Sequence, residues 1–375
     1  MNRICTIIAM NYLPQAMALL ESSRKVYPDV DFYVLIIDGT SKEVPHLPTA
    51  HILLPEDLII APEWLVQMRS YYDEMELATS LKPFLLKTLL DYDIETVTYL
   101  DPDILLFGEL TEGINVARDF GIALTPHRLT PSNILEPSFS ELDFLRYGIF
   151  NLGYIAVGQS SKEMLDWWGS RLRWYCTKFP NDPSFTDQKW INFVPALFNF
   201  GCVKSKGYNL ASWNLDERPL SLSGESYLAG ADALVFIHFA QMSGVLAAGK
   251  ETDHWKLPLN SNDEQLTSLQ IVKDITSGYS QKLVKNRMAL EKVNTRETTG
   301  FGISGHRKRI LITESVAEAR DASEGSMKAL KATRKVRFED FFKLLEKSSS
   351  LNGFRDGLVI DKTKFGKLIR RILAR

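Results

Sequence analysis

The sequence lacks several features that would place it outside ordinary globular proteins. Its three cysteines, Cys5, Cys176 and Cys202, share no metal-ligand spacing, so neither a disulfide framework nor a zinc site is indicated. No stretch approaches the roughly 18 uncharged apolar residues that a membrane-spanning helix needs. The first apolar run, Ile4–Met10, stops too early for a signal peptide. We therefore expect a cytoplasmic protein.

Strong overall charge is also absent, but the charge is unevenly distributed. The 375 residues carry a net charge of −2, with 45% hydrophobic and 24% charged residues, which is typical of a globular protein. The segment Ser326–Arg375 holds 14 Lys and Arg against 5 Asp and Glu, a net of +9, which leaves −11 for the remainder. The tail and the body therefore have different electrostatic roles.

The first two thirds of the chain alternate between strand and helix patterns. Ile4–Met10 and Phe32–Asp38 are continuous apolar runs, and Gln15–Val26 between them has an amphipathic helical pattern. This order predicts a parallel sheet covered on both faces. Further strands are predicted at 96–100, 120–124, 154–157 and 233–238. Helices are predicted at 63–91, 161–177 and 187–193, the first of them with breaks near 70–73 and at Pro83. The alternation favours an α/β fold with an open, mostly parallel, Rossmann-like sheet.

The pattern changes after about Lys256. Ser261–Val293 is predicted as a long helix, and Asn294–Gly305 is rich in Thr, Gly and Ser and predicts a linker. A last helix is predicted at Lys362–Arg375. We therefore expect a first domain at 1–255 and a C-terminal helical extension with a basic tail at 256–375.

Two aspartates follow the predicted strand at 96–100. Residues i and i+2 of an extended segment point to one side, so Asp101 and Asp103 can hold one cation together. Pro102 has no N–H to donate, which suits the end of a strand. A divalent ion on two aspartates at the carboxyl end of a strand is an arrangement that binds a diphosphate. The alternative is an ordinary Asp-Pro turn.

Four other segments carry candidate site residues. Lys82, on a helix before this strand, could reach a phosphate or could be a surface lysine. Asn151 could bind a hydroxyl or its own backbone, and Gly153 could let the backbone approach a ligand. Asp187 follows Thr186, a candidate N-cap, and either compensates the helix dipole or points into the crevice. His238 ends an apolar strand and suits either a structural role or a third ligand for Mn²⁺.

Taken together, these segments resemble a known family. The motifs in chain order are Leu77-x-x-x-Leu81-Lys82-Pro83, Tyr99-Leu100-Asp101-x-Asp103, Phe150-Asn151-x-Gly153, Asp187-Gln188 and His238-Phe239. This order is similar to that of the metal-dependent GT-A glycosyltransferases of family 8, which include glycogenin and the lipooligosaccharide galactosyltransferases. The resemblance covers roughly residues 3 to 250 and implies that 1–255 is a nucleotide-sugar-binding catalytic domain.

The resemblance implies that the chain transfers a sugar from a nucleotide diphosphate sugar to a saccharide acceptor, either a bacterial surface glycan or a lipid-linked saccharide, with Mn²⁺ or Mg²⁺ as cofactor and with retention of configuration. No nucleic-acid partner is expected. The implied metal ligands are Asp101, Asp103 and His238. The implied catalytic residues are Asp187 and Gln188 at the anomeric centre and Lys82 at the donor phosphate or sugar. The implied donor-binding residues are Ala9, Met10 and Asn11 at the nucleoside, Asp38 at the base or ribose, and Lys82 and Asn151 at the phosphate and a sugar hydroxyl. Asp187 is implied either to stabilise an oxocarbenium-like sugar or to act as a transient nucleophile.

The sequence departs from the family at one motif, and two rival functions stay open. The family often has a lysine shortly after its His-Phe pair, whereas here no lysine occurs before Lys250, so the donor class is in doubt. A sugar-phosphate nucleotidyltransferase is one rival, although the Met10–Ala16 segment lacks the glycine-rich phosphate loop expected there. A non-catalytic nucleotide-sugar-binding protein is the other. The segment Tyr208–Leu215 also looks like a motif of bacterial surface-polysaccharide transferases, without an assigned role.

The basic tail has two interpretations. Phe365, Leu368, Ile369 and Ile372 recur at helical spacing among cations, which is the pattern of a helix lying on an anionic membrane, here the inner face of the plasma membrane. Alternatively, the helix docks on the acidic body.

Overall fold

The computed structural model describes residues 2–39, 47, 49–91, 93–132, 141–178, 184–258 and 261–291. The chain divides into two compact units, Met1–Gly302 and Ile303–Arg375, and all described residues belong to the first. The predicted linker and the basic final helix lie outside the described residues. In the part of the chain that is described, no helix is both long and apolar enough to cross a membrane.

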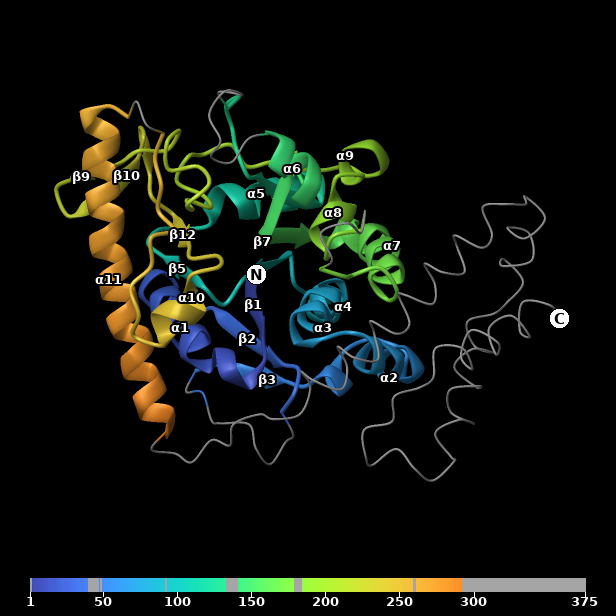
Figure 1. Cartoon of the computed structure of the whole chain (residues 1–375). Helices are drawn as coiled ribbons and strands as arrows, with labels where there is room; N and C mark the ends of the chain where they lie inside the picture. Colours follow the sequence, from blue (N-terminus) through green and yellow to red (C-terminus); the bar gives the residue numbers. More distant parts are fainter. Residues whose placement is uncertain are drawn as a thin grey trace, which may run out of the picture. The chain divides into compact units, whose positions relative to one another are not determined.

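A seven-stranded sheet forms the centre of the first unit, in the order β3-β2-β1-β4-β7-β6-β8 (Figure 1). Its strands are β1 (Asn2–Ile8), β2 (Asp31–Ile36), β3 (His51–Leu53), β4 (Thr96–Leu100), β6 (Ile122–Pro126), β7 (Phe150–Gly158) and β8 (Gly201–Cys202). Four neighbouring pairs are parallel, and β7 runs antiparallel to both β4 and β6. The predicted α/β fold with an open, mostly parallel sheet is confirmed, with β7 as the antiparallel exception.

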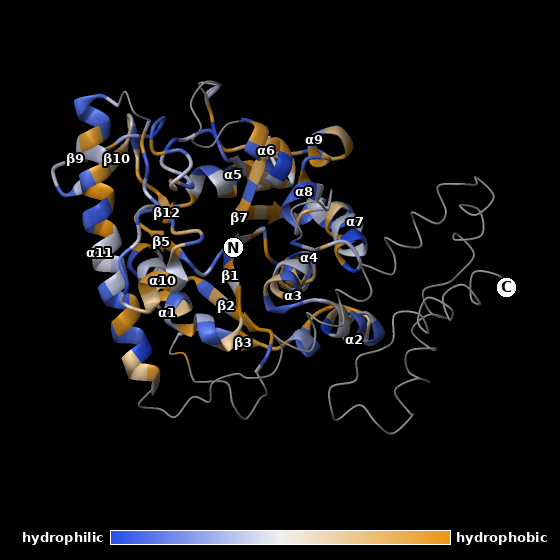
Figure 2. Ribbon diagram, viewed as in Figure 1, coloured by the Kyte–Doolittle hydropathy of each residue, from blue (hydrophilic) through white to orange (hydrophobic). Residues whose placement is uncertain are grey.

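Helices cover both faces of this sheet because successive strand residues point to opposite sides. Cys5 and Ile7 of β1 pack in one hydrophobic cluster, and Ile4 and Ile8 pack in the other. The first cluster is closed by helices α2 (Pro62–Tyr71), α3 (Glu74–Ser80), α4 (Lys82–Leu89) and α7 (Lys162–Leu172), and the second by α1 (Leu13–Val26) and α5 (Thr111–Phe120). Figure 2 shows hydrophobic residues along β1, β2 and β7, as burial on both faces requires.

The predicted helical stretch 63–91 is divided as its sequence indicates. The first break falls at Tyr72 and Asp73, where the Asp73 side chain accepts from the backbone N–H of Glu76 and caps α3. The second break is at Leu81, so Pro83 lies in the first turn of α4, where its missing N–H does no harm.

The predicted strand 233–238 is two short strands, because the chain changes partners within it. β11 (Asp232–Ala233) pairs with β10 (Ser226–Ala229), which in turn pairs with β9 (Leu220–Ser223). The N–H of Val235 then bonds to Gly207, and β12 (Phe236–His238) pairs antiparallel with β5 (Ile104–Leu106). This pairing brings His238 to the end of β4.

The predicted helix 261–293 is α11 (Asp263–Glu291), which runs along one side of the unit beside α1 (Figure 1). Its residues alternate between hydrophobic and hydrophilic in Figure 2, and Val272, Tyr279 and Leu283 are buried. The Tyr279 ring stacks on Phe239 at 4.1 Å, directly after His238. α11 therefore supports the segment that carries the site, while the predicted domain boundary at 255/256 stays a prediction.

Candidate functional site

Asp101 and Asp103 lie in a tight turn between β4 and β5. The N–H of Ile104 donates to the carbonyl of Asp101 at 3.1 Å, which closes a turn over Pro102. The prediction that the two carboxylates share one side of an extended segment is therefore wrong in its geometry. They converge because a turn, and not strand alternation, brings them together.

His238 completes a cluster with the two aspartates. Its Nε2 lies 3.2 Å from Asp103 Oδ1 and 3.7 Å from Asp101 Oδ2. One ligand atom from each of the three residues lies within 4.8 Å of the others. Two backbone hydrogen bonds hold the three residues in these relative positions: Phe239 N donates to Asp103 O at 2.9 Å, and Asp101 N donates to Gly153 O at 2.8 Å.

Burial and mutual attraction set the charges of this cluster. Burial lowers the pKa of His238, but Asp103 and Asp101 raise it more, so its pKa lies above the ordinary value. Burial likewise raises the pKa of Asp103, but His238 outweighs this effect and the pKa of Asp103 is lowered. Two carboxylates and one imidazole within one ligand sphere are a donor set that Mn²⁺ accepts, and the two carboxylates also suit Mg²⁺. The residues present therefore fit the cofactor that the sequence predicts.

Lys82 is buried beside this cluster, with 2% of its surface exposed. Its Nζ lies 2.9 Å from Asp187 Oδ2 and 3.3 Å from Asp101 Oδ1, and it donates to the carbonyl of Leu152 at 2.9 Å. The ammonium also lies 4.6 Å from the centre of the Tyr99 ring. Burial lowers the pKa of Lys82, but the two carboxylates raise it above the ordinary value, so the residue is a cation. The surface-lysine alternative is wrong.

Asp187 precedes α8 (Gln188–Ile191) and points at Lys82. Asp187, and not Thr186, occupies the N-cap position, and its side chain makes no capping bond. The predicted N-cap at Thr186 is therefore wrong. Burial raises the pKa of Asp187, and Lys82 offsets part of the rise. The contacts of Lys82 place the oxygens of Asp187 and Asp101 at most 6.2 Å apart, the sum of its two distances.

Asn151 and Gln188 use their polar atoms within the protein. Asn151 Oδ1 accepts from Gly153 N at 3.1 Å and from His238 Nδ1 at 3.1 Å. Gln188 Oε1 accepts from Leu152 N at 3.1 Å, and Gln188 Nε2 donates to the carbonyl of Tyr147 at 2.8 Å. A contact of either side chain with a sugar stays a prediction.

Gly153 makes room for the histidine. A Cβ atom at this position would lie 2.3 Å from Cε1 of His238 and 2.9 Å from Oδ1 of Asn151. The glycine thus allows the imidazole to approach β7, which is a different reason from the ligand approach that the sequence suggests.

The predicted nucleoside-binding residues lie at the end of β1. Ala9 and Met10 are buried, Asn11 is exposed, and the N–H of Met10 donates to Asp38 Oδ1 at 2.9 Å. The next residue, Tyr12, was not predicted. Partial burial raises its pKa, and the charges of Asp103 and Asp101 raise it further, although 37% of the residue is exposed.

Sequence reasoning also missed several residues that hold the cluster in place. Tyr99 donates its hydroxyl to Asp101 Oδ1 at 2.7 Å, and Ser243 donates to Asp103 Oδ2 at 3.3 Å. Tyr99 stands two residues before Asp101, so strand alternation was a usable signal. Ser243 has no such signal because it comes from α10 (Ser243–Ala247), 140 residues away.

The Tyr208–Leu215 segment packs around the imidazole of His238. The ring of Trp213 lies edge-on to it at 5.6 Å, and Asn209 Oδ1 lies 3.3 Å from His238 Nδ1. Asn214 holds the segment in shape by accepting from Ala211 N and donating to the carbonyl of His127. This motif has a structural role here.

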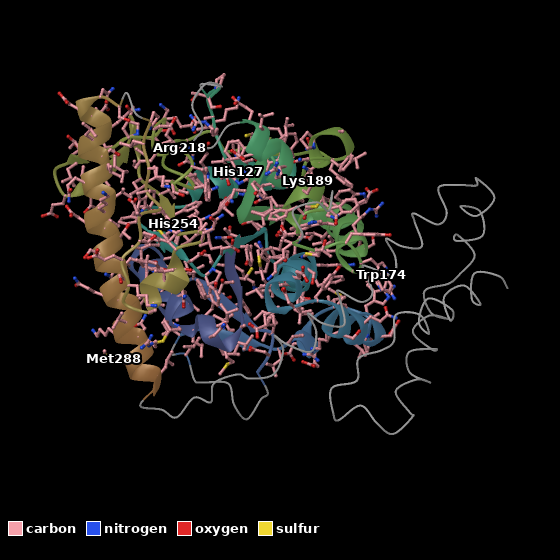
Figure 3. The ribbon with its side chains drawn as sticks, viewed as in Figure 1. His127, Trp174, Lys189, Arg218, His254 and Met288 are labelled. Carbon is pink, nitrogen blue, oxygen red and sulfur yellow. The ribbon has the colours of Figure 1, made fainter. Side chains whose placement is uncertain are left out.

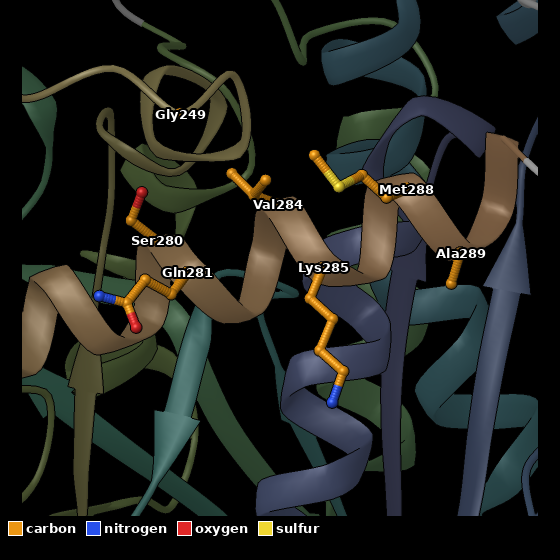
Figure 4. A pocket seen from close by; sticks show the side chains of 7 residues that line it. All are labelled: Gly249, Ser280, Gln281, Val284, Lys285, Met288 and Ala289. Atoms are coloured by element: carbon orange, nitrogen blue, oxygen red, sulfur yellow. The ribbon is translucent and has the colours of Figure 1, made fainter.

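A surface pocket lies along α11 and is separate from these residues (Figure 4). It is lined by Gly249, Ser280, Gln281, Val284, Lys285, Met288 and Ala289. Lys285 is its one ionisable side chain, so the pocket contains no residue set for acid–base or metal chemistry.

No family model matches the chain. Two Bacillus subtilis (strain 168) proteins are similar in sequence, and both are described as uncharacterized. YfnF is 26% identical over 247 residues, which is 63% of this chain and 80% of that protein. YfnD is 24% identical over 243 residues, which is 63% of this chain and 76% of that protein.

Several solved structures are similar in part. The galactosyltransferase LgtC, in complex with donor and acceptor sugar analogs, matches 65% of this chain and 88% of its own at 15% identity and a TM-score of 0.43. The glycosyltransferase GlyE of Streptococcus pneumoniae TIGR4 matches 80% of this chain and 65% of its own, at 10% identity and a TM-score of 0.44. Mouse xyloside xylosyltransferase 1 matches 64% of this chain and 98% of its own, at 12% identity and a TM-score of 0.38. At these scores, the likenesses do not assign an activity to the chain.

The Lys82–Asp187 pair predicts a specific pattern of stabilities. Lys82→Met should lower the free energy of unfolding by about 3–5 kcal/mol, because it leaves buried Asp187 without its cation. Adding Asp187→Asn removes that unpaired charge, so the double variant should be more stable than Lys82→Met alone. Urea unfolding of the four proteins measures this cycle. Additive losses would contradict the pairing.

Gly153→Ala should displace His238, because its new methyl group meets the imidazole at 2.3 Å. We expect a loss of about 1–3 kcal/mol in unfolding free energy and at least a tenfold weaker affinity for Mn²⁺. Gly244→Ala is the matched control, since a Cβ atom at that position would meet no atom within 4 Å beyond the neighbouring backbone of its own helix. Equal behaviour of the two variants in urea unfolding and Mn²⁺ titration would show that Gly153 has no such role.

Proposed function

We propose that this protein is a GT-A glycosyltransferase of the family 8 type, which transfers a hexosyl group from a nucleotide diphosphate sugar to a saccharide or lipid-linked acceptor. The observation that carries the proposal is the cluster of Asp101, Asp103 and His238, with the cation of Lys82 beside it. The cluster follows the carboxyl end of β4, the edge at which open α/β sheets bind their ligands.

The donor set supports a divalent cation, Mn²⁺ or Mg²⁺, held by Asp101, Asp103 and His238. Such a cation, when bound, is a Lewis acid for the diphosphate leaving group. Without a cation, Asp101 and Asp103 would repel any diphosphate that approached, so this site needs positive charge to bind one.

Lys82 supplies a fixed positive charge beside the leaving group. When the sugar–phosphate bond breaks, negative charge builds on the nucleoside diphosphate, and a buried ammonium that is already oriented stabilises it without reorganisation. Three partners orient Lys82: Asp101, Asp187 and the carbonyl of Leu152.

Asp187 is proposed to act mainly through Lys82. Its carboxylate is buried, with 3% of the residue exposed, and faces the ammonium, which suits a positioning residue better than a nucleophile that must reach the sugar. Retention of configuration, and the placement of Asn151 and Gln188 near the sugar, remain part of the proposal on the strength of the motif resemblance.

The nucleotidyltransferase alternative is less well supported. Residues 10–12 form a 3₁₀ turn after β1 with no glycine, whereas a phosphate-cradling loop needs a backbone free to approach the anion. The two reactions also differ in their products, because a glycosyltransferase releases a nucleoside diphosphate from the sugar donor and a nucleotidyltransferase releases pyrophosphate from a nucleoside triphosphate.

Asp103→Asn should reduce transfer at least 100-fold while the protein stays folded, because the amide removes a negative ligand and keeps the size. Donor hydrolysis with UDP-, GDP- and dTDP-sugars, at fixed Mn²⁺ and then in excess EDTA, measures the loss. Full turnover in EDTA would refute the metal-dependent reaction.

Asp166→Asn is the control for this experiment. Asp166 lies on α7, its side chain is 62% exposed, and its partner is Lys87. We expect its turnover to stay within about twofold of the wild type, since surface ion pairs contribute little.

The acceptor and the location are also proposed. The net charge of +9 in Ser326–Arg375 supports contact with an anionic membrane, and hence a lipid-linked acceptor. Removing Gly357–Arg375 should abolish co-sedimentation with phosphatidylglycerol vesicles at low salt and leave hydrolysis of a soluble donor unchanged. Equal sedimentation of both proteins would instead support docking of the tail on the acidic body.

A further inference from the structure

His127, labelled in Figure 3, directly follows β6 and is buried, yet it has no part in the proposed reaction. Its ring stacks on Phe144 at 4.8 Å and lies 5.3 Å from the ring of Trp213. Both ring nitrogens have partners. Nδ1 lies 3.1 Å from the carbonyl oxygen of Ile149, and Nε2 lies 3.3 Å from Nδ2 of Asn151.

These partners define the tautomer of His127. A carbonyl oxygen can only accept, so Nδ1 must carry the proton, and Nε2 of the neutral ring must then be an acceptor. Burial lowers the pKa of His127 to about 4, so the ring is neutral near pH 7 and keeps this lone pair.

The lone pair of His127 in turn orients the amide of Asn151, together with Gln188 Oε1, which accepts from Nδ2 of Asn151 at 3.4 Å. Only the NH₂ group can donate to Nε2, so Oδ1 must face the opposite way. There it accepts from Gly153 N, which is itself only a donor, and from Nδ1 of His238. A flipped amide would present its NH₂ to Gly153 N and lose that contact, and it would keep the contact with His238 only if Nδ1 of that ring gave up its proton.

The same chain of bonds holds the orientation of His238, with Asn209 Oδ1 as a second acceptor for Nδ1 at 3.3 Å. With Nδ1 donating to Asn151, the other nitrogen, Nε2, is the one that faces Asp103 at 3.2 Å and Asp101 at 3.7 Å. A histidine that ligates a metal through one nitrogen usually has its other nitrogen held by such a partner.

We propose that His127 is a positioning residue, which orients the Asn151 amide and thereby directs Nε2 of His238 into the metal cluster. This inference rests on the proposed function, because it assigns supporting residues to the metal site. It gives Asn151 a role that does not require contact with the sugar.

The test measures Mn²⁺ affinity by titration, separately from turnover. His127→Phe keeps the ring and its stacking but removes both nitrogens, and it should weaken Mn²⁺ binding about 10- to 100-fold, the usual effect of losing such a partner. His127→Gln offers an oxygen acceptor to Asn151 and should stay within about fivefold of the wild type. Phe144→Leu disturbs the same stack without touching a hydrogen bond, and it should leave Mn²⁺ affinity nearly unchanged.

A second background isolates the amide. In Asn151→Leu there is no amide left for His127 to orient, so adding His127→Phe should then change Mn²⁺ affinity less than twofold. Thermal melts accompany each variant, and His127→Met replaces His127→Phe if the latter does not fold.

The outcomes separate this inference from the proposed function. Wild-type protein that binds Mn²⁺, with His127→Phe no weaker than Phe144→Leu, would overturn the positioning role and leave the proposed function standing. An equal effect of His127→Phe in both backgrounds would also overturn it. Wild-type protein that binds no Mn²⁺ would overturn both.

Discussion

The position of the site depends on one buried cation. Lys82 is 2% exposed, and an ammonium group at such a place is strongly destabilising unless its charge and its donors are matched. Asp101, Asp187 and the carbonyl of Leu152 match them, and these three partners come from the turn after β4, the residue before α8 and the strand β7. Because each partner must stay within contact distance, Lys82 ties α4 to three elements that are distant in the sequence.

A layer of neutral groups surrounds the cluster and restricts its geometry. Asn151, Asn209 and Trp213 enclose the imidazole of His238, while Gly153 leaves the space that the ring fills. Buried polar groups of this kind specify one arrangement, because any other would leave a donor or an acceptor without a partner. The charged residues supply the chemistry, and the neutral layer determines where it takes place.

Much of the central fold follows from the sequence, and its failures have local causes. The predicted strand at 96–100 is β4 residue for residue, because five consecutive buried residues end at the polar Asp101-Pro102 pair. The strand predicted at 233–238 is divided, since its N–H groups bond in turn to Tyr227, Gly207 and Leu210. The pattern of apolar residues predicts which residues are buried, but it does not predict which neighbouring segment accepts each backbone hydrogen bond. The antiparallel direction of β7 is missed for the same reason.

The sequence by itself determined the residue types of the site and their order along the chain, because each one ends or adjoins a segment with a strong local pattern. It also determined the open α/β sheet, since helical and extended periodicities alternate clearly over the first 250 residues. Only the tertiary structure decided which of these residues meet. Four features of the site depend on backbone conformation or on long-range contacts: the turn at Pro102, the burial of Lys82, the N-cap position of Asp187 and the hydrogen bonds from His127 to His238. They depend on distances between segments up to about 140 residues apart, such as Asp103 and Ser243, and packing and hydrogen-bond satisfaction set those distances once the elements come together.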